Sequence, residues 1–367
     1  MSAVPGDETG RHGETEHPPL TEAISVPSAA AGPGAMRIAV LGAGSWGTTF
    51  AKVLADGGAD VLVWSRRREV AHEITETHRN SGYLPGINLP SNLRGHDSLE
   101  HVLAGAEQVY LSVPSQSLRS NLASIRDILP ADVPIVSLMK GVERGTGLRM
   151  SEVIEGELGV ERERIAAVSG PNLALEIARR EPTAAVVASI HHATAVAVAQ
   201  AATNDYFRTF VNTDVIGTEF GGVLKNLIAV AVGIADGVGY GENTKASIIT
   251  RGLVELTDFA VAFGARPETM IGLAGLGDLI ATCESPLSRN NAAGRLLGQG
   301  YGFEQVIAQM NQTAEGLASV GPILELAASK GVSMPIVAQV AQVLDGTLDP
   351  RELAPHLATD SDEPQAE

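Results

Sequence analysis

The sequence predicts an α/β protein of two parts, a sheet domain followed by an all-helical domain. Residues 37 to 214 alternate short runs rich in β-branched residues with amphipathic stretches, the pattern of a parallel sheet covered by helices. From Gly217 onward these runs stop, and long apolar segments with helical spacing take over. A glycine-rich turn follows the first run directly. We place the sheet domain at residues 36–214 and the helical domain at residues 215–357.

Each element follows from its local pattern. Seven runs have the length and composition of buried strands: Arg37–Leu41, Asp60–Trp64, Gln108–Val113, Pro134–Leu138, Ile165–Ser169, Ala184–Ala188 and Phe207–Val211. Six segments of the second half have helical spacing: 217–236, 243–263, 289–299, 303–311, 315–330 and 335–345.

The two ends have a different composition. Residues 1–35 are rich in Pro, Gly, Glu and Ala without an apolar period, so we expect a disordered extension with no signal peptide. Residues 358–367 have the composition of a solvated acidic tail.

Composition excludes several classes of function. The chain has 367 residues with 43 acidic against 26 basic side chains, and a net charge of −17 argues against a nucleic-acid surface. No apolar run reaches about 18 residues without interruption, so no integral membrane segment is expected. A single cysteine, Cys283, cannot form an intramolecular disulfide and suits a reducing compartment. We therefore expect a cytoplasmic protein.

The glycine-rich turn has the G-x-G-x-x-G spacing at Gly42, Gly44 and Gly47, between a strand and a helix. Gly42 allows the tight turn, Gly44 lets the backbone approach a pyrophosphate, and Gly47 lets the helix pack closely on the strand. This placement predicts a Rossmann-like dinucleotide-binding domain. The alternative is a turn that binds nothing, because glycines are frequent here, 40 of 367 residues.

The residues after the second strand bear on which dinucleotide is bound. An acidic residue that would bind an adenosine ribose is missing there, and the strand continues into Ser65, Arg66, Arg67 and Arg68. An arginine can accept a 2′-phosphate, so NADP(H) is tolerated or preferred over NAD(H), with Arg66 or Arg67 on the phosphate. A solvated basic start to the next helix is the alternative.

Two lysines stand out, since only five of the 26 basic residues are lysines. Lys140 follows the strand at 134–138, at the edge where open α/β sheets bind ligands. Lys225 lies in an otherwise apolar helix, where burial and a nearby cation would lower its pKa toward that of a general base. The alternative for Lys225 is a lysine whose ammonium reaches water. A dehydrogenase acting on an alcohol needs one such proton carrier.

A second candidate site lies in the helical half. Leu276-Gly277-Asp278 and Ser288-Arg289-Asn290-Asn291 bracket Cys283 in what we expect to be a polar, turn-rich interruption between helices. Ser288 is a good N-cap, and Arg289 with the free amides of the next helix would bind a phosphate. A structural cap with an exposed arginine is the alternative. Ser169-Gly170-Pro171-Asn172 offers amides at the turn after another strand.

Together these segments resemble a known family. Eight motifs occur in order: Gly-Ala-Gly-Ser-Trp-Gly-Thr at 42–48, Val-Pro-Ser at 113–115, Met-Lys-Gly at 139–141, Ser-Gly-Pro at 169–171, Gly-Gly-Val-Leu-Lys-Asn at 221–226, Ile-Thr-Arg-Gly at 249–252, Gly-Leu-Gly-Asp-Leu at 275–279 and Ser-Arg-Asn at 288–290. The chain from about residue 36 to 350 thus closely resembles the soluble bacterial NAD(P)-dependent glycerol-3-phosphate dehydrogenases.

The resemblance implies a reversible reaction between sn-glycerol 3-phosphate and dihydroxyacetone phosphate with NADP(H) or NAD(H), which supplies glycerol 3-phosphate for phospholipid synthesis. It implies Lys225 as proton donor and acceptor, a homodimer and no metal. The implied substrate residues are Lys140, Gly170, Asn172, Lys225, Asp278, Ser288, Arg289 and Asn290. The implied cofactor residues are Gly42, Gly44, Ser45, Trp46, Gly47, Arg66, Arg67, Lys140, Ala174, Arg289 and Glu315.

One position departs from the family, since many relatives carry Thr where this chain has Asn172. Two other functions stay open at this point. A dehydrogenase for a hydroxy acid or sugar acid would not need the phosphate site at Ser288–Asn290. A non-catalytic dinucleotide sensor would have no reason to keep Lys225 beside a substrate pocket.

Overall fold

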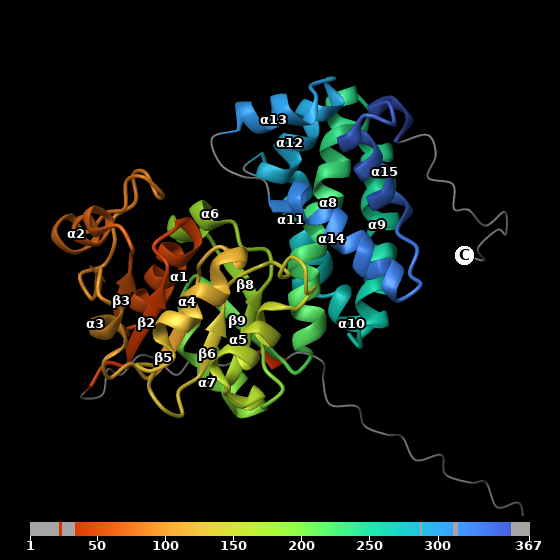
Figure 1. Cartoon of the computed structure of the whole chain (residues 1–367). Helices are drawn as coiled ribbons and strands as arrows, with labels where there is room; N and C mark the ends of the chain where they lie inside the picture. Colours follow the sequence, from red (N-terminus) through yellow and green to blue (C-terminus); the bar gives the residue numbers. More distant parts are fainter. Residues whose placement is uncertain (1–21, 24–33, 287, 311–314, 354–367) are drawn as a thin grey trace, which may run out of the picture.

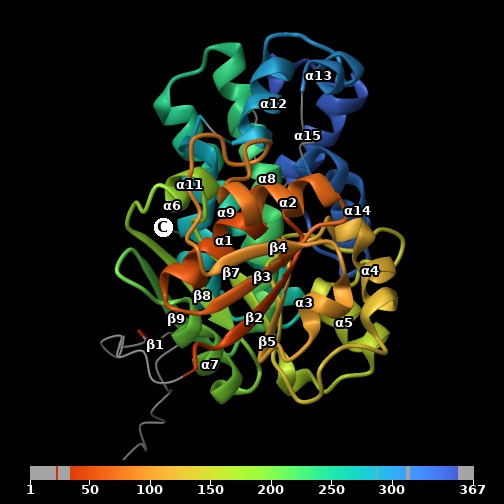
Figure 2. The ribbon, with the colours of Figure 1, turned by 90° about the vertical axis from the view of Figure 1, so that its left-hand side faces the viewer.

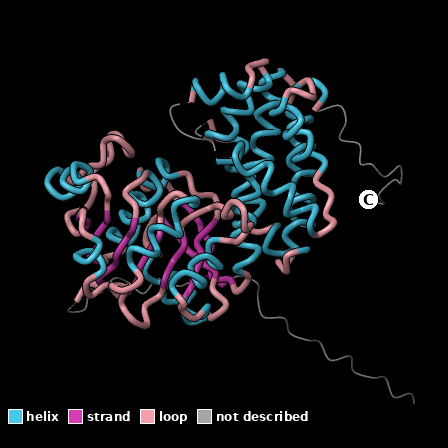
Figure 3. Tube along the Cα trace, viewed as in Figure 1, coloured by secondary structure: helices cyan, strands magenta, loops and turns pink. Residues whose placement is uncertain are grey.

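The structure is a computed structural model that describes residues 22–23, 34–286, 288–310 and 315–353. The described strands all lie in one half of the molecule, and the other half consists of helices (Figures 1 and 3). The expected tail at 358–367 and most of the expected extension at 1–35 lie outside the described residues. The expectation of disorder throughout residues 1–35 is wrong for Glu22–Ala23 (β1), which pairs antiparallel with β9 and forms the edge of the sheet.

The sheet contains nine strands: β1, β2 (Arg37–Leu41), β3 (Asp60–Trp64), β4 (Leu93–His96), β5 (Gln108–Leu111), β6 (Ile135–Ser137), β7 (Ile165–Ser169), β8 (Thr183–Ala188) and β9 (Phe207–Asn212). The seven expected strands are confirmed, with ends that differ by one or two residues. Their spatial order is β1-β9-β8-β7-β6-β5-β2-β3-β4. Counted from β2, the six strands from β4 to β7 stand in the order 3-2-1-4-5-6 and are parallel, which is the Rossmann arrangement.

The prediction of a parallel sheet is wrong at β8, which pairs antiparallel with β7. The only helix between them, α6 (Ala174–Ala178), has five residues. Such a helix is about 8 Å long, whereas a parallel crossover must return the chain along a strand of about 17 Å. The chain therefore turns back at the same edge, and β9 then runs parallel to β8.

Strand β4 was not expected, because Leu-Arg-Gly-His has neither β-branched residues nor alternation. It is a strand only through its pairing with β3, from Val61 with Leu93 to Trp64 with His96. Figure 2 shows β4, β3, β2 and β5 in succession across the sheet.

Helices cover both faces of the sheet. In β2, Ile38 and Val40 join the buried cluster that contains α1 and α7, while Ala39 and Leu41 join the cluster that contains α4 and α5. This alternation follows from the two-residue period of a strand. The helices of this domain are α1 (Ser45–Asp56), α2 (Arg68–Thr77), α3 (Leu99–Leu103), α4 (Leu118–Ile125), α5 (Met150–Leu158), α6 and α7 (His192–Ala202).

The helical domain is built around α8 (Val215–Val238), of which 20 of 24 residues are buried. Asp214 caps its N-terminus by accepting a hydrogen bond from the Gly217 amide. The helices around it are α9 (Glu242–Ala262), α10 (Pro267–Met270), α11 (Asp278–Glu284), α12 (Arg289–Gly298), α13 (Phe303–Gln309), α14 (Glu315–Ser329) and α15 (Pro335–Asp345). Within the described ranges, α8 alone is long and apolar enough to cross a membrane, but 89% of its apolar window is buried inside the fold.

Glycines set the distance between α8 and α12. Gly233 and Gly237 on α8 face Gly294 and Gly298 on α12, both pairs four residues apart and hence on one helix face. A Cβ added to Gly294 would lie 2.9 Å from the Cα of Gly233 and closer still to the carbonyl oxygen of Val230. The two backbones are therefore in direct contact, which places Arg289 and Asn290 at the N-terminus of α12 close to α8.

We predict that Gly294→Ala lowers the free energy of unfolding by about 1–3 kcal/mol, because the added methyl group forces the two helices apart. Gly156→Ala is the matched control, since Gly156 is exposed in α5 with open space around its Cα. That change should stabilise the protein by about 0.5–1 kcal/mol through the lower entropy of the unfolded chain. Chemical denaturation measures both, and an equal effect of the two changes would contradict the packing argument.

Candidate active site

The glycine-rich turn forms an open cradle at the carboxyl end of β2. Gly42 has φ +120°, which disfavours other residues, and a Cβ on Gly47 would lie 3.0 Å from the Ser112 side chain. At Gly44, in contrast, no atom comes within 4 Å of an added Cβ. Gly44 is also the N-cap of α1 and has no capping side chain. The first amides of α1 thus face open space that suits an anion such as a pyrophosphate.

The two residues after Gly44 have structural contacts of their own. The Ser45 hydroxyl donates to the Tyr83 carbonyl oxygen at 3.1 Å. The indole Nε1 of Trp46 donates to the Leu138 carbonyl oxygen at 3.0 Å, and its ring packs edge-on against Phe50. Trp46 thereby ties the start of α1 to the end of β6, two residues before Lys140.

Arg66 and Arg67 lie in the turn that follows β3, and both side chains are exposed. The guanidinium of Arg67 stacks over the Tyr83 ring at 5.3 Å from its centroid and lies 4.0 Å from Glu69. Strand β3 ends at Trp64 and is followed by Ser65, so no acidic residue stands at the position where one would bind an adenosine ribose. Exposed cations at this place can reach a phosphate.

The two lysines singled out in the sequence meet at one carboxylate. Lys140 Nζ donates to Asp278 Oδ2 at 2.7 Å and to the Gly170 carbonyl oxygen at 3.0 Å. Lys225 Nζ donates to Asp278 Oδ1 and to Thr282 Oγ1, the latter at 2.7 Å. The Asp278 carboxylate therefore bridges the loop after β6 to α8. Because Asp278 is 1% exposed, this bridge lies in a water-poor site.

The surroundings of Lys225 change its acidity. Lys225 is 8% exposed, and burial lowers its pKa to about 8, assisted by the nearby charge of Lys140 and opposed by Asp278. A pKa near 8 lets an amine both give and take a proton close to neutral pH. The prediction that burial and a second cation would lower this pKa is confirmed, and the alternative of a lysine reaching water is wrong.

Asn172 and Ser169 leave polar groups unpaired beside Lys140. Both polar side-chain atoms of Asn172 and the Ser169 hydroxyl are buried without a hydrogen-bond partner. Ser169 lies against Gly222 of α8, where an added Cβ would be 2.7 Å from its hydroxyl and 3.2 Å from Lys140 Cγ. Unpaired buried polar groups are costly, so they indicate a place for hydroxyl groups of a ligand. Ala174 begins α6, and its carbonyl oxygen accepts from Thr49.

The segment between Leu276 and Ser288 is not the turn-rich interruption that the sequence suggested. It forms a π-helical turn over Leu273–Gly277 and then α11. The prediction failed because glycines usually end helices, whereas Gly275 is needed here for close contact with Met270. Cys283 lies inside α11, and burial raises the pKa of its thiol to about 12, which makes it unreactive.

Ser288 caps α12, accepting from the Asn291 amide at 3.3 Å, as predicted. Asn290 is 8% exposed, and both ends of its side-chain amide have a protein partner. Its Nδ2 donates to Asn226 Oδ1 at 2.9 Å, and its Oδ1 accepts from the Gly316 amide at 3.0 Å. Asn290 thus joins the starts of α12 and α14 to the residue next to Lys225. The side chain of Glu315 lies outside the described part of the structure.

Arg289 is exposed at the mouth of a cleft of about 480 Å³ between the two domains. The cleft is lined by Tyr83, Pro114, Ser115, Gln116, Val142, Arg144, Arg289, Ala318, Ser319 and Pro322. The structure therefore places Arg289, at the start of α12, in a cleft whose lining includes residues of the sheet domain. None of the Asp278 cluster, defined as Lys140, Lys225, Asp278 and Thr282, lines this cleft.

Sequence reasoning missed Thr282 and Asn226. Thr282 lies four residues after Asp278, so both side chains lie on one face of α11 and both reach Lys225. Asn226 directly follows Lys225 and fixes Asn290. The spacing of Asp278 and Thr282 was a usable signal, but only once the segment is known to be helical. No group of three or more metal-ligating side chains occurs among residues 22–23, 34–286, 288–310 and 315–353.

Comparison with known proteins identifies the family of the chain. A family model described as the N-terminus of NAD-dependent glycerol-3-phosphate dehydrogenase matches residues 37–195, and one described as its C-terminus matches residues 214–355. A glycerol-3-phosphate dehydrogenase (NAD(P)+) of Leifsonia xyli is 71% identical over 328 residues, 89% of each chain. One of Streptomyces griseus is 51% identical over 330 residues, 90% of this chain and 98% of the relative.

A solved structure is similar over nearly the same part of the chain. The crystal structure of glycerol-3-phosphate dehydrogenase from Coxiella burnetii matches with a TM-score of 0.83 at 36% identity, covering 89% of this chain and 99% of that chain. Fold, matched segments and relatives point the same way, and the chain belongs to the NAD-dependent glycerol-3-phosphate dehydrogenase family.

Proposed function

We propose that this chain interconverts sn-glycerol 3-phosphate and dihydroxyacetone phosphate with NAD(P)(H), and that Lys225 is its proton donor and acceptor. The observation that carries the proposal is the buried Lys225, held by Asp278 and Thr282 where the carboxyl edge of the sheet meets the helical domain. The names of the relatives support the reaction.

The chemistry requires a proton at the oxygen while a hydride moves at the carbon. The nicotinamide, when bound, supplies or accepts the hydride. Lys225, as an ammonium, would donate a proton to the ketone oxygen during reduction, and as a neutral amine it would take the hydroxyl proton during oxidation. Asp278 and Thr282 orient the Lys225 nitrogen, and Asp278 holds Lys140 beside it.

Substrate binding would use both domains. Asn172 has donor and acceptor atoms free for the substrate hydroxyls, next to Lys140 and Gly170. Arg289 and the amides at the start of α12, with Ser288 and Asn290 fixed in place, would bind the phosphate. Binding the remote phosphate would orient the reacting carbon.

The cofactor would lie along the carboxyl edge of the sheet. The cradle at Gly42, Gly44 and Gly47 would hold the pyrophosphate, and Arg66 or Arg67 would contact an adenosine 2′-phosphate. Ser45 and Trp46 would shape this site through their contacts with Tyr83 and Leu138 rather than through free polar atoms. The remaining cofactor residues of the proposal are Lys140, Ala174, Arg289 and Glu315.

Further parts of the proposal rest on the family. We propose domains at residues 36–214 and 215–357, a cytoplasmic homodimer, and a supply of glycerol 3-phosphate for phospholipid synthesis. Exposed Val254 and Val261, seven residues apart on one face of α9, offer apolar surface to a second copy.

Purified protein should oxidise NADPH when dihydroxyacetone phosphate is added, followed as loss of absorbance at 340 nm. Lys225→Met should lower kcat by about 10²–10⁴-fold, because the proton donor is lost. NADPH affinity, measured by fluorescence titration, should stay near the wild-type value. Lys245→Met is the matched control, since Lys245 pairs with Asp236, about three turns further along α8. A near wild-type kcat in Lys225→Met would remove Lys225 from the mechanism.

The two directions should depend on pH in opposite ways. Because burial lowers the pKa of Lys225 to about 8, its ammonium form is present below that pH and its neutral form above it. The kcat for reduction should therefore fall as pH rises through about 8, and the kcat for oxidation should rise. Initial rates from pH 6 to 10 measure both profiles. Parallel profiles in the two directions would contradict the assignment.

The double change Arg66→Ala/Arg67→Ala should raise KM for NADPH by about tenfold or more, the value of one or two lost charge-assisted hydrogen bonds. KM for NADH should change little, because NADH has no 2′-phosphate. Arg68→Ala is the control, since this side chain is 90% exposed beside Asp97. Equal losses with NADH and NADPH would show that the arginines do not read the phosphate.

A further inference from the structure

A short hairpin begins two residues after Lys140 and joins the two domains. This interdomain hairpin, residues 142–149, is closed by an antiparallel bridge between Val142 and Arg149. The Glu143 amide donates to the Leu148 carbonyl oxygen at 2.8 Å, and Gly145 and Gly147 make the turn with φ +82° and +70°. Because the hairpin begins two residues after Lys140, its placement affects where the Lys140 backbone lies.

The helical domain holds one side of the interdomain hairpin. Val142 is buried in the apolar cluster of the helical domain, although it follows a strand of the sheet. Gly147 packs against Leu326 of α14, where an added Cβ would lie 3.2 Å from Cγ. Arg149 Nη1 donates to Glu219 Oε2 of α8 at 2.6 Å. These three contacts attach the interdomain hairpin to the helical domain.

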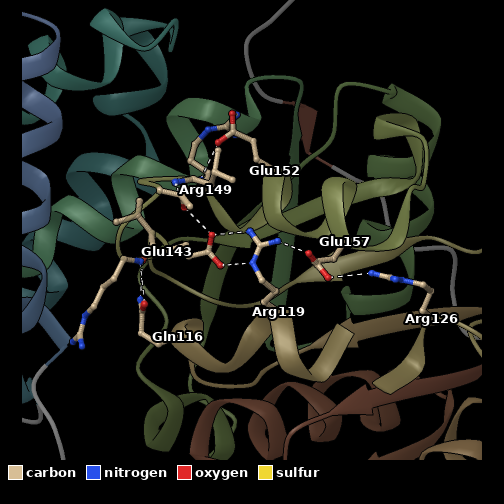
Figure 4. Close-up of polar contacts among 11 residues, drawn as sticks. Gln116, Arg119, Arg126, Glu143, Arg149, Glu152 and Glu157 are labelled. Atoms are coloured by element: carbon tan, nitrogen blue, oxygen red, sulfur yellow. Dashed lines mark hydrogen bonds and ion pairs between the residues drawn. The ribbon is translucent and has the colours of Figure 1, made fainter. Parts of the chain in front are cut away.

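The sheet domain holds the other side through Arg119 of α4. Arg119 donates Nε and Nη2 to the two oxygens of Glu143, both at 2.8 Å. Figure 4 shows the chain of ion pairs that continues from Arg119 to Glu157 of α5 and on to Arg126. The Arg119 guanidinium holds the pKa of Glu143 below its usual value, so the bidentate pair persists at neutral pH.

The backbone between Lys140 and the hairpin is held as well. Gln116 Nε2 donates to the Val142 carbonyl oxygen at 2.8 Å, and Gln116 Oε1 accepts from the Arg144 amide at 3.0 Å. A Cβ on Gly141 would lie 2.6 Å from that of Ser115, so Gly141 is pressed against the loop after β5. These contacts restrain the backbone between Lys140 and Glu143, so a displacement of Glu143 would be transmitted to Lys140.

We propose that Arg119 is a positioning residue for Lys140: its bidentate pair with Glu143 holds the interdomain hairpin so that the Lys140 ammonium stays on Asp278, beside Lys225. The inference rests on the reaction proposed above. The Lys140 nitrogen donates to both Gly170 and Asp278, so a displacement of its backbone would weaken at least one of these hydrogen bonds. Arginine suits this position because two of its nitrogens each donate to a separate oxygen of Glu143, a planar bidentate geometry that the single nitrogen of a lysine does not reproduce.

The pKa of Lys225 distinguishes a positioning role of Arg119 from a role in stability alone. The charged groups beside Lys225 are Asp278 and Lys140, and Thr282 and Cys283 are neutral. The charge of Lys140 helps to lower the pKa of Lys225. If Lys140 moves away, Lys225 loses a neighbouring positive charge and keeps its ion pair with Asp278, so the pKa of Lys225 rises.

The test compares R119A with R126A in the full-length protein, with dihydroxyacetone phosphate and NADPH. Arg126 is the matched control, because it joins the same ion-pair chain at Glu157 but does not touch the hairpin. We expect R119A to lower kcat/KM for dihydroxyacetone phosphate by about tenfold or more. The fall in its rate of reduction at alkaline pH should shift to higher pH, and R126A should stay within about twofold of wild type.

R119K keeps the charge but not the bidentate pair, so it should show the same pH shift with a smaller loss of rate. It also carries the test if R119A does not fold. An active wild type in which R119A and R119K lose rate without a pH shift, or behave like R126A, would overturn the inference alone. A wild type that does not oxidise NADPH with dihydroxyacetone phosphate would overturn the proposed function and the inference with it.

Discussion

One carboxylate connects the two buried or half-buried lysines of the candidate active site. Asp278 accepts a hydrogen bond from Lys140 on one oxygen and from Lys225 on the other. Without it, two ammonium groups this close in a water-poor site would repel each other, and nothing would compensate for their lost hydration. Because Lys140 belongs to the sheet domain and Lys225 to the helical domain, the same carboxylate also joins the two domains. The positions of both lysine nitrogens thus depend on one side chain.

Small residues let the surrounding elements approach that centre. Gly221 and Gly222 of α8 face the π-helical turn and Ser169, and at neither position does a Cβ fit without displacing its neighbours. The contact of α8 with α12 depends on glycines in the same way, and through Asn290 and Asn226 it connects the start of α12 to the helix that carries Lys225. Close packing and the placement of polar side chains therefore have one cause, the missing side chains of glycine.

The polar side chains of the candidate site differ in whether the protein itself supplies their hydrogen-bond partners. Asn290, Thr282 and Ser288 have protein partners, whereas Ser169 and Asn172 have buried polar atoms without one. Such unpaired atoms favour a ligand with hydroxyl groups over an apolar one, because they gain hydrogen-bond partners on binding. Asn172 suits such a ligand, since an amide both donates and accepts hydrogen bonds.

Local chemistry in the sequence determined much of this protein: the strand Arg37–Leu41, the turn at Gly42, the cap at Ser288 and the candidate lysines all follow from patterns a few residues long. Tertiary structure decided the rest. It reversed β8, made β4 a strand by pairing alone, and turned residues 273–284 into helix. It also brought Lys140 to Asp278, 138 residues away, and Arg119 to Glu143. Periodicity and turn propensity report on neighbours in the chain, whereas these pairs exist only because the order of strands and the packing of α8 bring distant segments together.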